Sequence, residues 1–163
     1  MAPYVAKAEI LINAPIDLIW SINLDLAKYK EWNPFIVCVT NIPPQLAVGS
    51  KITLHARFSD GTKSTSQEAV TDLVPPYMNA SAGGVCRAVL AYKYSGLLPH
   101  VGLVNGTRYQ WLEQKVNSAT TLYRTEETFT GPGAVLVPVE QVQDGFQRHA
   151  IALRDRAEAF SRT

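Results

Sequence analysis

His149 has the residue type and the spacing for acid–base chemistry inside a folded domain. It lies three residues after Phe146 and four residues before Leu153, so it shares one apolar face of a helix with both. An imidazole that faces a ligand cavity from such a helix can act as a general acid or base near neutral pH. The same spacing suits a buried histidine that hydrogen-bonds a nearby strand, and this structural role is the favoured alternative.

Arg108 and Glu127 are the second pair of candidate catalytic residues. They lie on two successive predicted strands, and cross-strand partners come within contact distance in an antiparallel sheet. A carboxylate beside a guanidinium can anchor a polar ligand or polarise a carbonyl group. Two orientations of strand 107–115 are compatible with the sequence, because turning Tyr109 and Trp111 inward would place Arg108 outside. Those two large aromatic rings favour the second facing, and with it a structural or surface ion pair.

Further side chains are candidates for the wall of a ligand cavity. Glu68 can face inward because it lies two residues before the apolar Val70, although its polar neighbours favour an exposed or edge position. Tyr92 and Tyr94 alternate with Lys93, and their hydroxyl groups would be available to a ligand. The predicted lining, besides His149, comprises Trp20, Trp32, Leu54, Phe58, Glu68, Leu90, Tyr92, Tyr94, Phe129, Val142 and Phe146.

A series of strands followed by one long helix must position these residues. Alternation of apolar and polar residues, and turn signals such as Asp60-Gly61, predict strands over 4–12, 35–42, 52–58, 63–73, 85–94, 107–115 and 120–130. Two short helices are expected over 15–24 and 26–31, with Asn13 as a cap and Pro15 in the first turn. Apolar residues at three- and four-residue spacing predict a helix over 138–160. The apolar segment 95–106 is expected to form a lid or cavity rim.

The chain opens with an apolar strand that runs into Asn13-Ala14-Pro15, a helix anchored by Trp20, and a helical turn that ends at Trp32-Asn33-Pro34. Later sequence features are the 95–106 loop, Glu127-Thr-Phe-Thr-Gly131, and Gly145-Phe146 followed by Leu153 and Glu158. Taken in this order, the features cover nearly the whole chain. Together they resemble the START-like superfamily, also called the polyketide cyclase/dehydrase, birch-pollen-allergen-like or SRPBCC superfamily.

The resemblance implies an α+β helix-grip fold over a single domain, residues 1–163. In this fold a curved antiparallel sheet of about seven strands wraps around a long C-terminal helix. One helix cannot fill such a sheet, which leaves a central apolar cavity in the size class of small-ligand sites. The superfamily includes lipid carriers, hormone receptors, cyclases, dehydratases and oxygenase domains, so the resemblance predicts the fold better than the chemistry.

Composition excludes several other classes of protein. A net charge of +1 without a basic stripe disfavours nucleic acid as a partner, and no apolar run reaches the length of a membrane span. The N-terminus lacks the charged-then-apolar order of a signal peptide, so we expect a cytoplasmic protein. Cys38 and Cys86, and the three histidines, lack the spacing of a zinc site. No nucleotide-binding motif appears, and we expect neither a metal nor a cofactor.

Two functions are compatible with these features. The first is a cofactor-free enzyme that cyclises, dehydrates or isomerises a polyketide-like, carbonyl-rich intermediate in its cavity, as a monomer or homodimer. The second is a non-catalytic carrier or sensor of a hydrophobic small molecule. A partner-binding module is disfavoured by the unremarkable charge pattern. Two or more polar groups that converge within reach of one bound atom would favour the enzyme.

Overall fold

The computed structural model describes residues 4–162 and contains a sheet of seven strands with one long helix. The strands are β1 (Tyr4–Ile12), β2 (Ile36–Thr40), β3 (Lys51–Arg57), β4 (Lys63–Asn79), β5 (Val85–Tyr94), β6 (Asn105–Lys115) and β7 (Thr121–Thr130). The α-helices are α1 (Ile16–Leu24), α2 (Tyr29–Trp32), α3 (Leu97–His100) and α4 (Val139–Ser161). Short 3-10 turns are η1 (Leu26–Lys28), η2 (Ala80–Ala82) and η3 (Pro132–Leu136).

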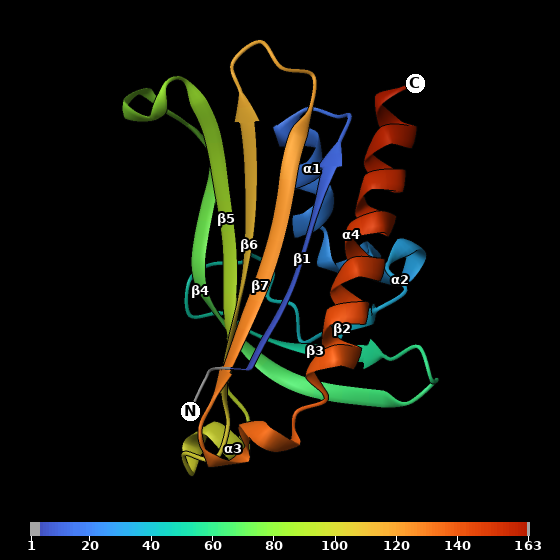
Figure 1. Cartoon of the computed structure of the whole chain (residues 1–163), viewed down its shortest axis with the longest axis vertical. Helices are drawn as coiled ribbons and strands as arrows, with labels where there is room; N and C mark the ends of the chain where they lie inside the picture. Colours follow the sequence, from blue (N-terminus) through green and yellow to red (C-terminus); the bar gives the residue numbers. More distant parts are fainter. Residues whose placement is uncertain (1–3, 163) are drawn as a thin grey trace.

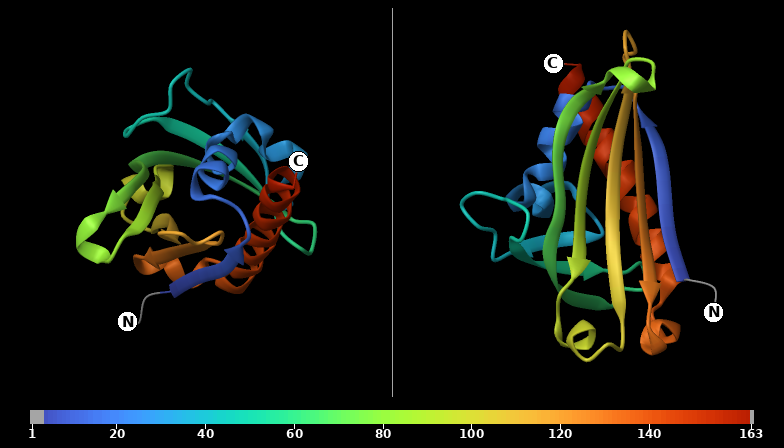
Figure 2. Two further views of the ribbon diagram at one scale, coloured as in Figure 1. Left: turned by 90° about the horizontal axis from the view of Figure 1, so that it is seen from above. Right: turned by 90° about the vertical axis from the view of Figure 1, so that its left-hand side faces the viewer.

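The strands form one antiparallel sheet in the order β1-β7-β6-β5-β4-β3-β2. Figure 1 shows α4 running along the concave side of this sheet, next to β1. Seen from above, the sheet curls around α4, and α1 and α2 lie within the same curve (Figure 2). This arrangement confirms the predicted helix-grip fold.

The predicted apolar face of α4 forms a large part of the core. Phe146, His149, Leu153 and Ala157 are all buried at helical spacing. Gly145 lets the helix approach the β2 end of the sheet, because a Cβ atom there would lie 2.4 Å from the ring of Phe35. The close packing at this point fixes the position of α4 across the sheet.

Strand β6 faces the opposite way from the favoured prediction. Arg108 and Gln110 are buried on the concave side, whereas Tyr109 is exposed and Trp111 is half-buried on the outer face. The two aromatic rings stack on each other with centroids 5.3 Å apart and planes 7° apart. By stacking, the two rings remove part of their apolar surface from water although neither ring lies in the core. The size of the aromatic side chains therefore does not predict which face of this strand is buried.

Three local predictions also differ from the structure. Strand β4 continues past Pro75-Pro76, because the prolines fall where the pairing with β5 shifts register and no ladder hydrogen bond is needed. Asn13 does not cap α1: Pro15 occupies the N-cap, and the Ile16 N–H donates to Gln114 Oε1 at 3.1 Å. The 95–106 segment was expected to be a loop, but it contains the single helical turn α3 and the start of β6.

Candidate ligand-binding and catalytic site

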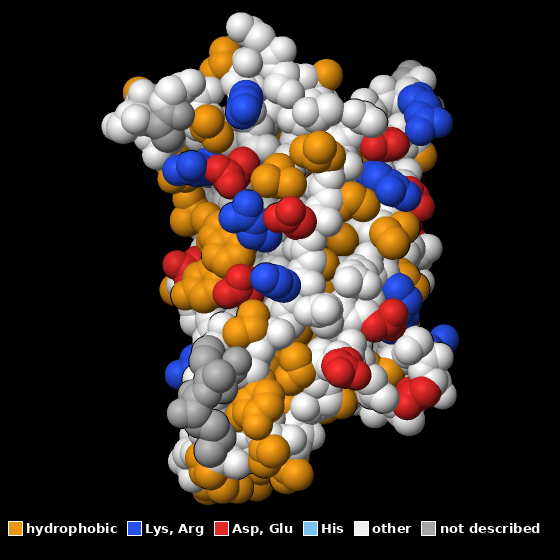
Figure 3. All heavy atoms as spheres, in the orientation of Figure 1, with side chains coloured by type: hydrophobic (Ala, Val, Ile, Leu, Met, Phe, Trp, Pro, Cys, Tyr) orange, Lys and Arg blue, Asp and Glu red, His pale blue; other side chains and the backbone are white. Residues whose placement is uncertain are grey.

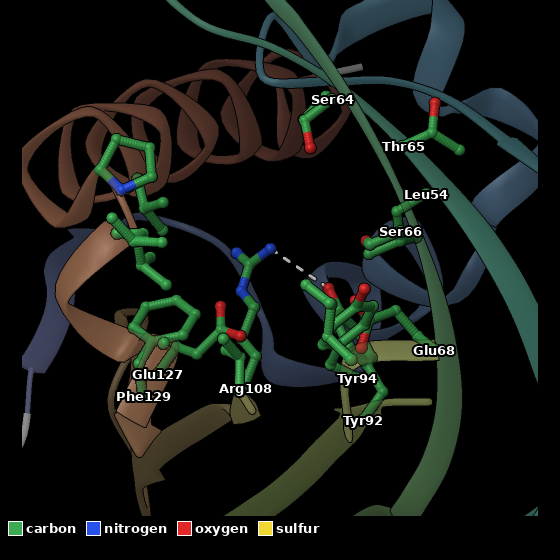
Figure 4. A pocket seen from close by; sticks show the side chains of 18 of the residues that line it. Leu54, Ser64, Thr65, Ser66, Glu68, Tyr92, Tyr94, Arg108, Glu127 and Phe129 are labelled. Atoms are coloured by element: carbon green, nitrogen blue, oxygen red, sulfur yellow. Dashed lines mark hydrogen bonds between the residues drawn. The ribbon is translucent and has the colours of Figure 1, made fainter. Parts of the chain in front are cut away.

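A cavity of about 560 Å³ lies between the sheet, the N-terminal half of α4, and the α3 and η3 turns. Most of its wall is apolar, and a smaller set of polar side chains faces it from β4, β5, β6 and β7. Figure 4 shows Ser64, Ser66 and Glu68 on one side of this space and Arg108 and Glu127 on the other. A cavity of this size and lining is typical of small-molecule sites.

The structure brings most of the predicted site residues to this cavity. Those that line it are Leu54, Phe58, Glu68, Tyr92, Tyr94, Arg108, Glu127, Phe129, Val142 and Phe146. The rim prediction is also confirmed, because Leu98, Leu103 and Val104 of the 95–106 segment belong to the wall. Whether these residues bind a ligand stays a prediction.

Trp20, Trp32, Leu90 and His149 do not line the cavity, which corrects the predicted lining. The space inside the sheet is filled at the end where α1 and α2 lie, and hollow at the end where α3 and η3 lie. Trp20 and Leu90 are core residues of the filled part. The ring of Trp32 packs edge-on against Tyr29, with centroids 5.1 Å apart. Helical and strand periodicity predict that a residue faces inward, but not how far along the cavity axis it lies.

His149 has the structural role that the sequence favoured as its alternative. Its Nδ1 lies 2.9 Å from the amide nitrogen of Asn33, whose oxygen accepts the backbone N–H groups of Phe35 and Ile36. This network assigns Nδ1 as the acceptor, so the proton sits on Nε2, which is buried without a partner among the described residues. The ring stacks on Tyr123 with planes 2° apart. Burial, with the positive charge of Arg108, holds the pKa of His149 well below its usual value and keeps it neutral.

Arg108 is the polar centre of the cavity. Its guanidinium lies over the ring of Phe146, with Cζ 4.1 Å from the centroid. Nε donates to Thr125 Oγ1 at 3.0 Å, Nη1 to the Tyr92 hydroxyl at 3.1 Å, and Nη2 to the Tyr123 hydroxyl at 3.5 Å. A guanidinium has five N–H groups, so two remain to hydrogen-bond a ligand. The sequence anticipated an ion pair with Glu127, but the hydrogen bonds of Arg108 within the described residues go to neutral side chains.

Tyr92 is oriented by two donors that approach the same oxygen. Its hydroxyl oxygen accepts from Arg108 Nη1 at 3.1 Å, the bond drawn as a dashed line in Figure 4, and from Gln110 Nε2 at 3.4 Å. Gln110 is held in turn by the Tyr123 hydroxyl, which donates to its Oε1 at 2.8 Å. This oxygen already accepts two hydrogen bonds, and the Tyr92 O–H has no acceptor among the described residues. It can therefore donate to a molecule in the cavity that Tyr92 lines. Burial raises the pKa of Tyr92, so its proton stays in place.

Glu68 and Glu127 are carboxyl groups that the cavity keeps partly protonated. Burial, with the nearby charge of Glu127, raises the pKa of Glu68 to about 8. Burial raises the pKa of Glu127 to about 7, against the opposing effect of Arg108. Gly106 makes room for the Glu127 carboxyl, because a Cβ there would lie 2.7 Å from its Oε1. Near neutral pH one carboxyl can therefore donate a proton while the other accepts one.

The residues that hydrogen-bond Arg108 and Tyr92 were not among the predicted site residues. Gln110, Tyr123 and Thr125 orient Arg108 and Tyr92 from the concave face of β6 and β7. On β7, alternation already places Tyr123 and Thr125 on the same face as Glu127. On β6, the inward position of Gln110 could be assigned only once the facing of that strand was known. The polar neighbours of Glu68 that favour an exposed or edge position include Ser64 and Ser66, and both line the cavity instead.

No protein-family model matches the chain, and a search of curated proteins found no match. Among solved structures, the Zhui aromatase/cyclase from Streptomyces sp. R1128 superposes with a TM-score of 0.70 at 17% identity, over 96% of this chain and 94% of that one. The protein Ara h 8.0201 has a TM-score of 0.62 at 14% identity, over 97% of this chain and 99% of that one. The di-domain aromatase/cyclase BexL has a TM-score of 0.66 at 14% identity, over 96% of this chain and 50% of its own. These neighbours are consistent with the SRPBCC resemblance, and at such identities the likeness shows the fold.

The described residues contain no cluster of three or more His, Cys, Asp or Glu side chains that could hold a metal ion. Among residues 4–162, no helix has the length and apolar character needed to cross a bilayer.

We predict that His149→Phe changes stability rather than activity. The substitution keeps the ring bulk but leaves the Asn33 amide without its acceptor, which should lower the free energy of unfolding by about 1–3 kcal/mol. Urea unfolding measures this loss, and ligand affinity and turnover should stay within a few-fold of wild type. A large loss of turnover at unchanged stability would place His149 in the mechanism after all.

We predict that the stability of the protein falls between about pH 5 and pH 8 because of Glu68. Its pKa is raised in the folded state to about 8, so the folded protein binds more protons than the unfolded chain across this range, and rising pH favours unfolding. Glu68→Gln should therefore become progressively more stable than wild type from pH 5 to pH 8 in urea unfolding. Glu126→Gln, on the outer face of β7, is the control for loss of a carboxyl. Parallel pH profiles for Glu68→Gln and wild type would contradict the raised pKa.

Proposed function

We propose that this chain acts as a single domain that binds a hydrophobic, carbonyl-bearing small molecule in its cavity. We further propose that it catalyses a cofactor-free cyclisation, dehydration or isomerisation of a polyketide-like intermediate. The observation that carries the proposal is the convergence of unused donors from Arg108 and Tyr92 on the apolar cavity. Several neighbours with the same fold are aromatase/cyclases, which supports the same class of reaction.

The donors of Arg108 and Tyr92 would stabilise an oxygen that gains negative charge. When a carbonyl becomes an enolate, its oxygen changes from a weak to a strong hydrogen-bond acceptor. Donors that are already oriented in a water-poor cavity stabilise this charge without reorganising during the reaction. Thr125, Gln110 and Tyr123 supply that orientation through the hydrogen bonds described above.

Glu127 and Glu68 would move the protons. In a cyclisation, the Glu127 carboxylate takes a proton from the carbon beside the carbonyl, and the electron pair of that C–H bond moves to the carbonyl oxygen. The resulting enolate carbon attacks a second carbonyl of the same molecule and forms a C–C bond. The protonated Glu68 carboxyl then gives its proton to the new alkoxide. Carboxyl pKa values of about 7 and 8 suit these roles near neutral pH.

A non-catalytic carrier or sensor would need the apolar cavity but not this polar arrangement. A single hydrogen bond would anchor the polar end of a carried ligand. Here a cation, a hydroxyl group and two carboxyls with raised pKa values face the same cavity. Groups of this kind are concentrated at catalytic sites, which favours the enzyme.

We predict that Tyr92→Phe and Glu127→Gln slow the cyclisation of a synthetic linear tetraketone. After ring closure, loss of the new hydroxyl group as water and enolisation give an aromatic product, which can be followed by its ultraviolet absorbance. Loss of the Tyr92 donor should lower turnover by about 10²–10³-fold, and loss of the Glu127 proton acceptor by about 10²–10⁴-fold. Tetraketone affinity should change less, because the apolar wall is intact.

Tyr94→Phe is the matched control, since Tyr94 lies on the same strand and lines the same cavity. It should turn over within a few-fold of wild type. Circular dichroism and thermal unfolding would confirm that each variant is folded. A wild-type protein that binds the tetraketone without accelerating its cyclisation would instead be a carrier.

A further inference from the structure

Six exposed aliphatic side chains gather at one end of the molecule, around α3 and η3. We call this surface the apolar tip. Figure 3 shows hydrophobic side chains concentrated at this lower end, where Figure 1 places α3. Leu97 is 75% exposed and Leu136 is 84% exposed, and exposed apolar side chains that gather in a patch mark an interaction surface. The members are Leu97, Leu98, Val101, Leu103, Val135 and Leu136.

The two segments of the apolar tip are joined into one surface. The Gly133 N–H donates to the Leu103 carbonyl at 2.8 Å, which links η3 to the segment after α3. Gly131 has a φ of +99°, and a Cβ there would lie 2.5 Å from the Leu103 oxygen. Within the other segment, the Leu103 N–H donates to the Leu98 carbonyl at 3.0 Å. These backbone bonds present the six side chains together.

The apolar tip carries no formal charge. Residues 95–106 and 131–138 include no Asp, Glu, Lys or Arg, and His100 is the one ionisable side chain among them. A protein surface that binds an acidic protein or an anionic lipid membrane carries Lys and Arg side chains around the contact. The chemistry of this surface therefore matches an uncharged, apolar partner.

The apolar tip is also continuous with the cavity. Leu98, Leu103 and Leu136 line the cavity and are exposed on the outside of the molecule. A hydrophobic molecule moving along these side chains would stay in contact with apolar surface from the outside to the cavity wall. The proposed ligand of this cavity has the same apolar character.

We propose that the apolar tip docks onto the surface of an electrically neutral lipid bilayer, which places the mouth of the cavity against the hydrocarbon region. A protruding end with aliphatic side chains can enter the soft interface of a bilayer, where each buried side chain lowers the free energy of binding. A hydrophobic ligand can then pass between bilayer and cavity without crossing water. Docking itself does not depend on the proposed catalysis, whereas the ligand route rests on the proposed ligand binding.

Vesicles of phosphatidylcholine alone, with and without bromine on the acyl chains, test this proposal directly. Leu97→Trp and Leu136→Trp each place a fluorescent indole in the apolar tip, and brominated chains should quench both. Val48→Trp is the matched control, because Val48 is 63% exposed and lies outside the apolar tip. Its fluorescence should not change between the two vesicle types.

A charge variant tests the same surface without a probe. In vesicle flotation, Leu97→Glu combined with Val135→Glu, two exposed sites of the apolar tip that do not line the cavity, should lower the fraction bound to phosphatidylcholine at least tenfold. Leu11→Glu, at a site 64% exposed on β1, should bind like wild type. Thermal unfolding and tetraketone turnover without vesicles should be unchanged in both variants, which separates docking from the proposed function.

Three outcomes would overturn the proposal. The first is the absence of wild-type binding to neutral vesicles. The second is binding that appears only when anionic lipid is added. The third is a dimer in light scattering that the double Glu variant dissociates, which would make the apolar tip an interface between two copies of the chain.

Discussion

The burial of one cation, Arg108, is the constraint on which the rest of this site depends. A buried charge is costly unless hydrogen bonds replace the water that it loses. Thr125, Tyr92 and Tyr123 replace that water on one side of the guanidinium, and the Phe146 ring covers it. Two N–H groups are left without a partner among the described residues, so the same interactions that make Arg108 tolerable in the core leave donors for a molecule in the cavity that Arg108 lines.

The cavity exists because the sheet is filled from one end only. Helices α1 and α2 fill the end that contains Trp20 and Leu90, where His149 joins Asn33 to the core. At the other end the covering elements are the short turns α3 and η3, which contribute rim residues rather than bulk. The filled part and the cavity thus lie at opposite ends of the space inside the sheet, and they share wall residues such as Phe146. This division explains how a histidine on the correct face of α4 serves the core rather than the cavity.

Much of this fold could be predicted from the sequence. Alternation and helical spacing located every strand and the long helix, because burial of one face imposes a period of two on strands and of 3.6 on helices. The facing of β6 could not be predicted, since hydrophobicity favours Tyr109 and Trp111 inside and hydrogen bonding favours Arg108 there. The hydrogen-bond partners of Arg108 lie on β5 and β7 and become neighbours only after the sheet forms. Position along the cavity axis, which separated Leu90 from Tyr92, is likewise a property of the assembled fold.

We propose that Arg108 and Tyr92 together hold a ligand oxygen that carries negative charge. This proposal can be tested with 2-naphthol, a flat apolar probe whose ionised form has a distinct absorption spectrum. An apolar cavity alone would disfavour the naphtholate and raise the pKa of the bound probe. With the donors of Arg108 and Tyr92 on its oxygen, bound 2-naphthol should instead ionise at lower pH than the free molecule in a titration followed by absorbance. Ionisation of the bound probe at higher pH than free 2-naphthol would show that these donors do not stabilise a negative oxygen.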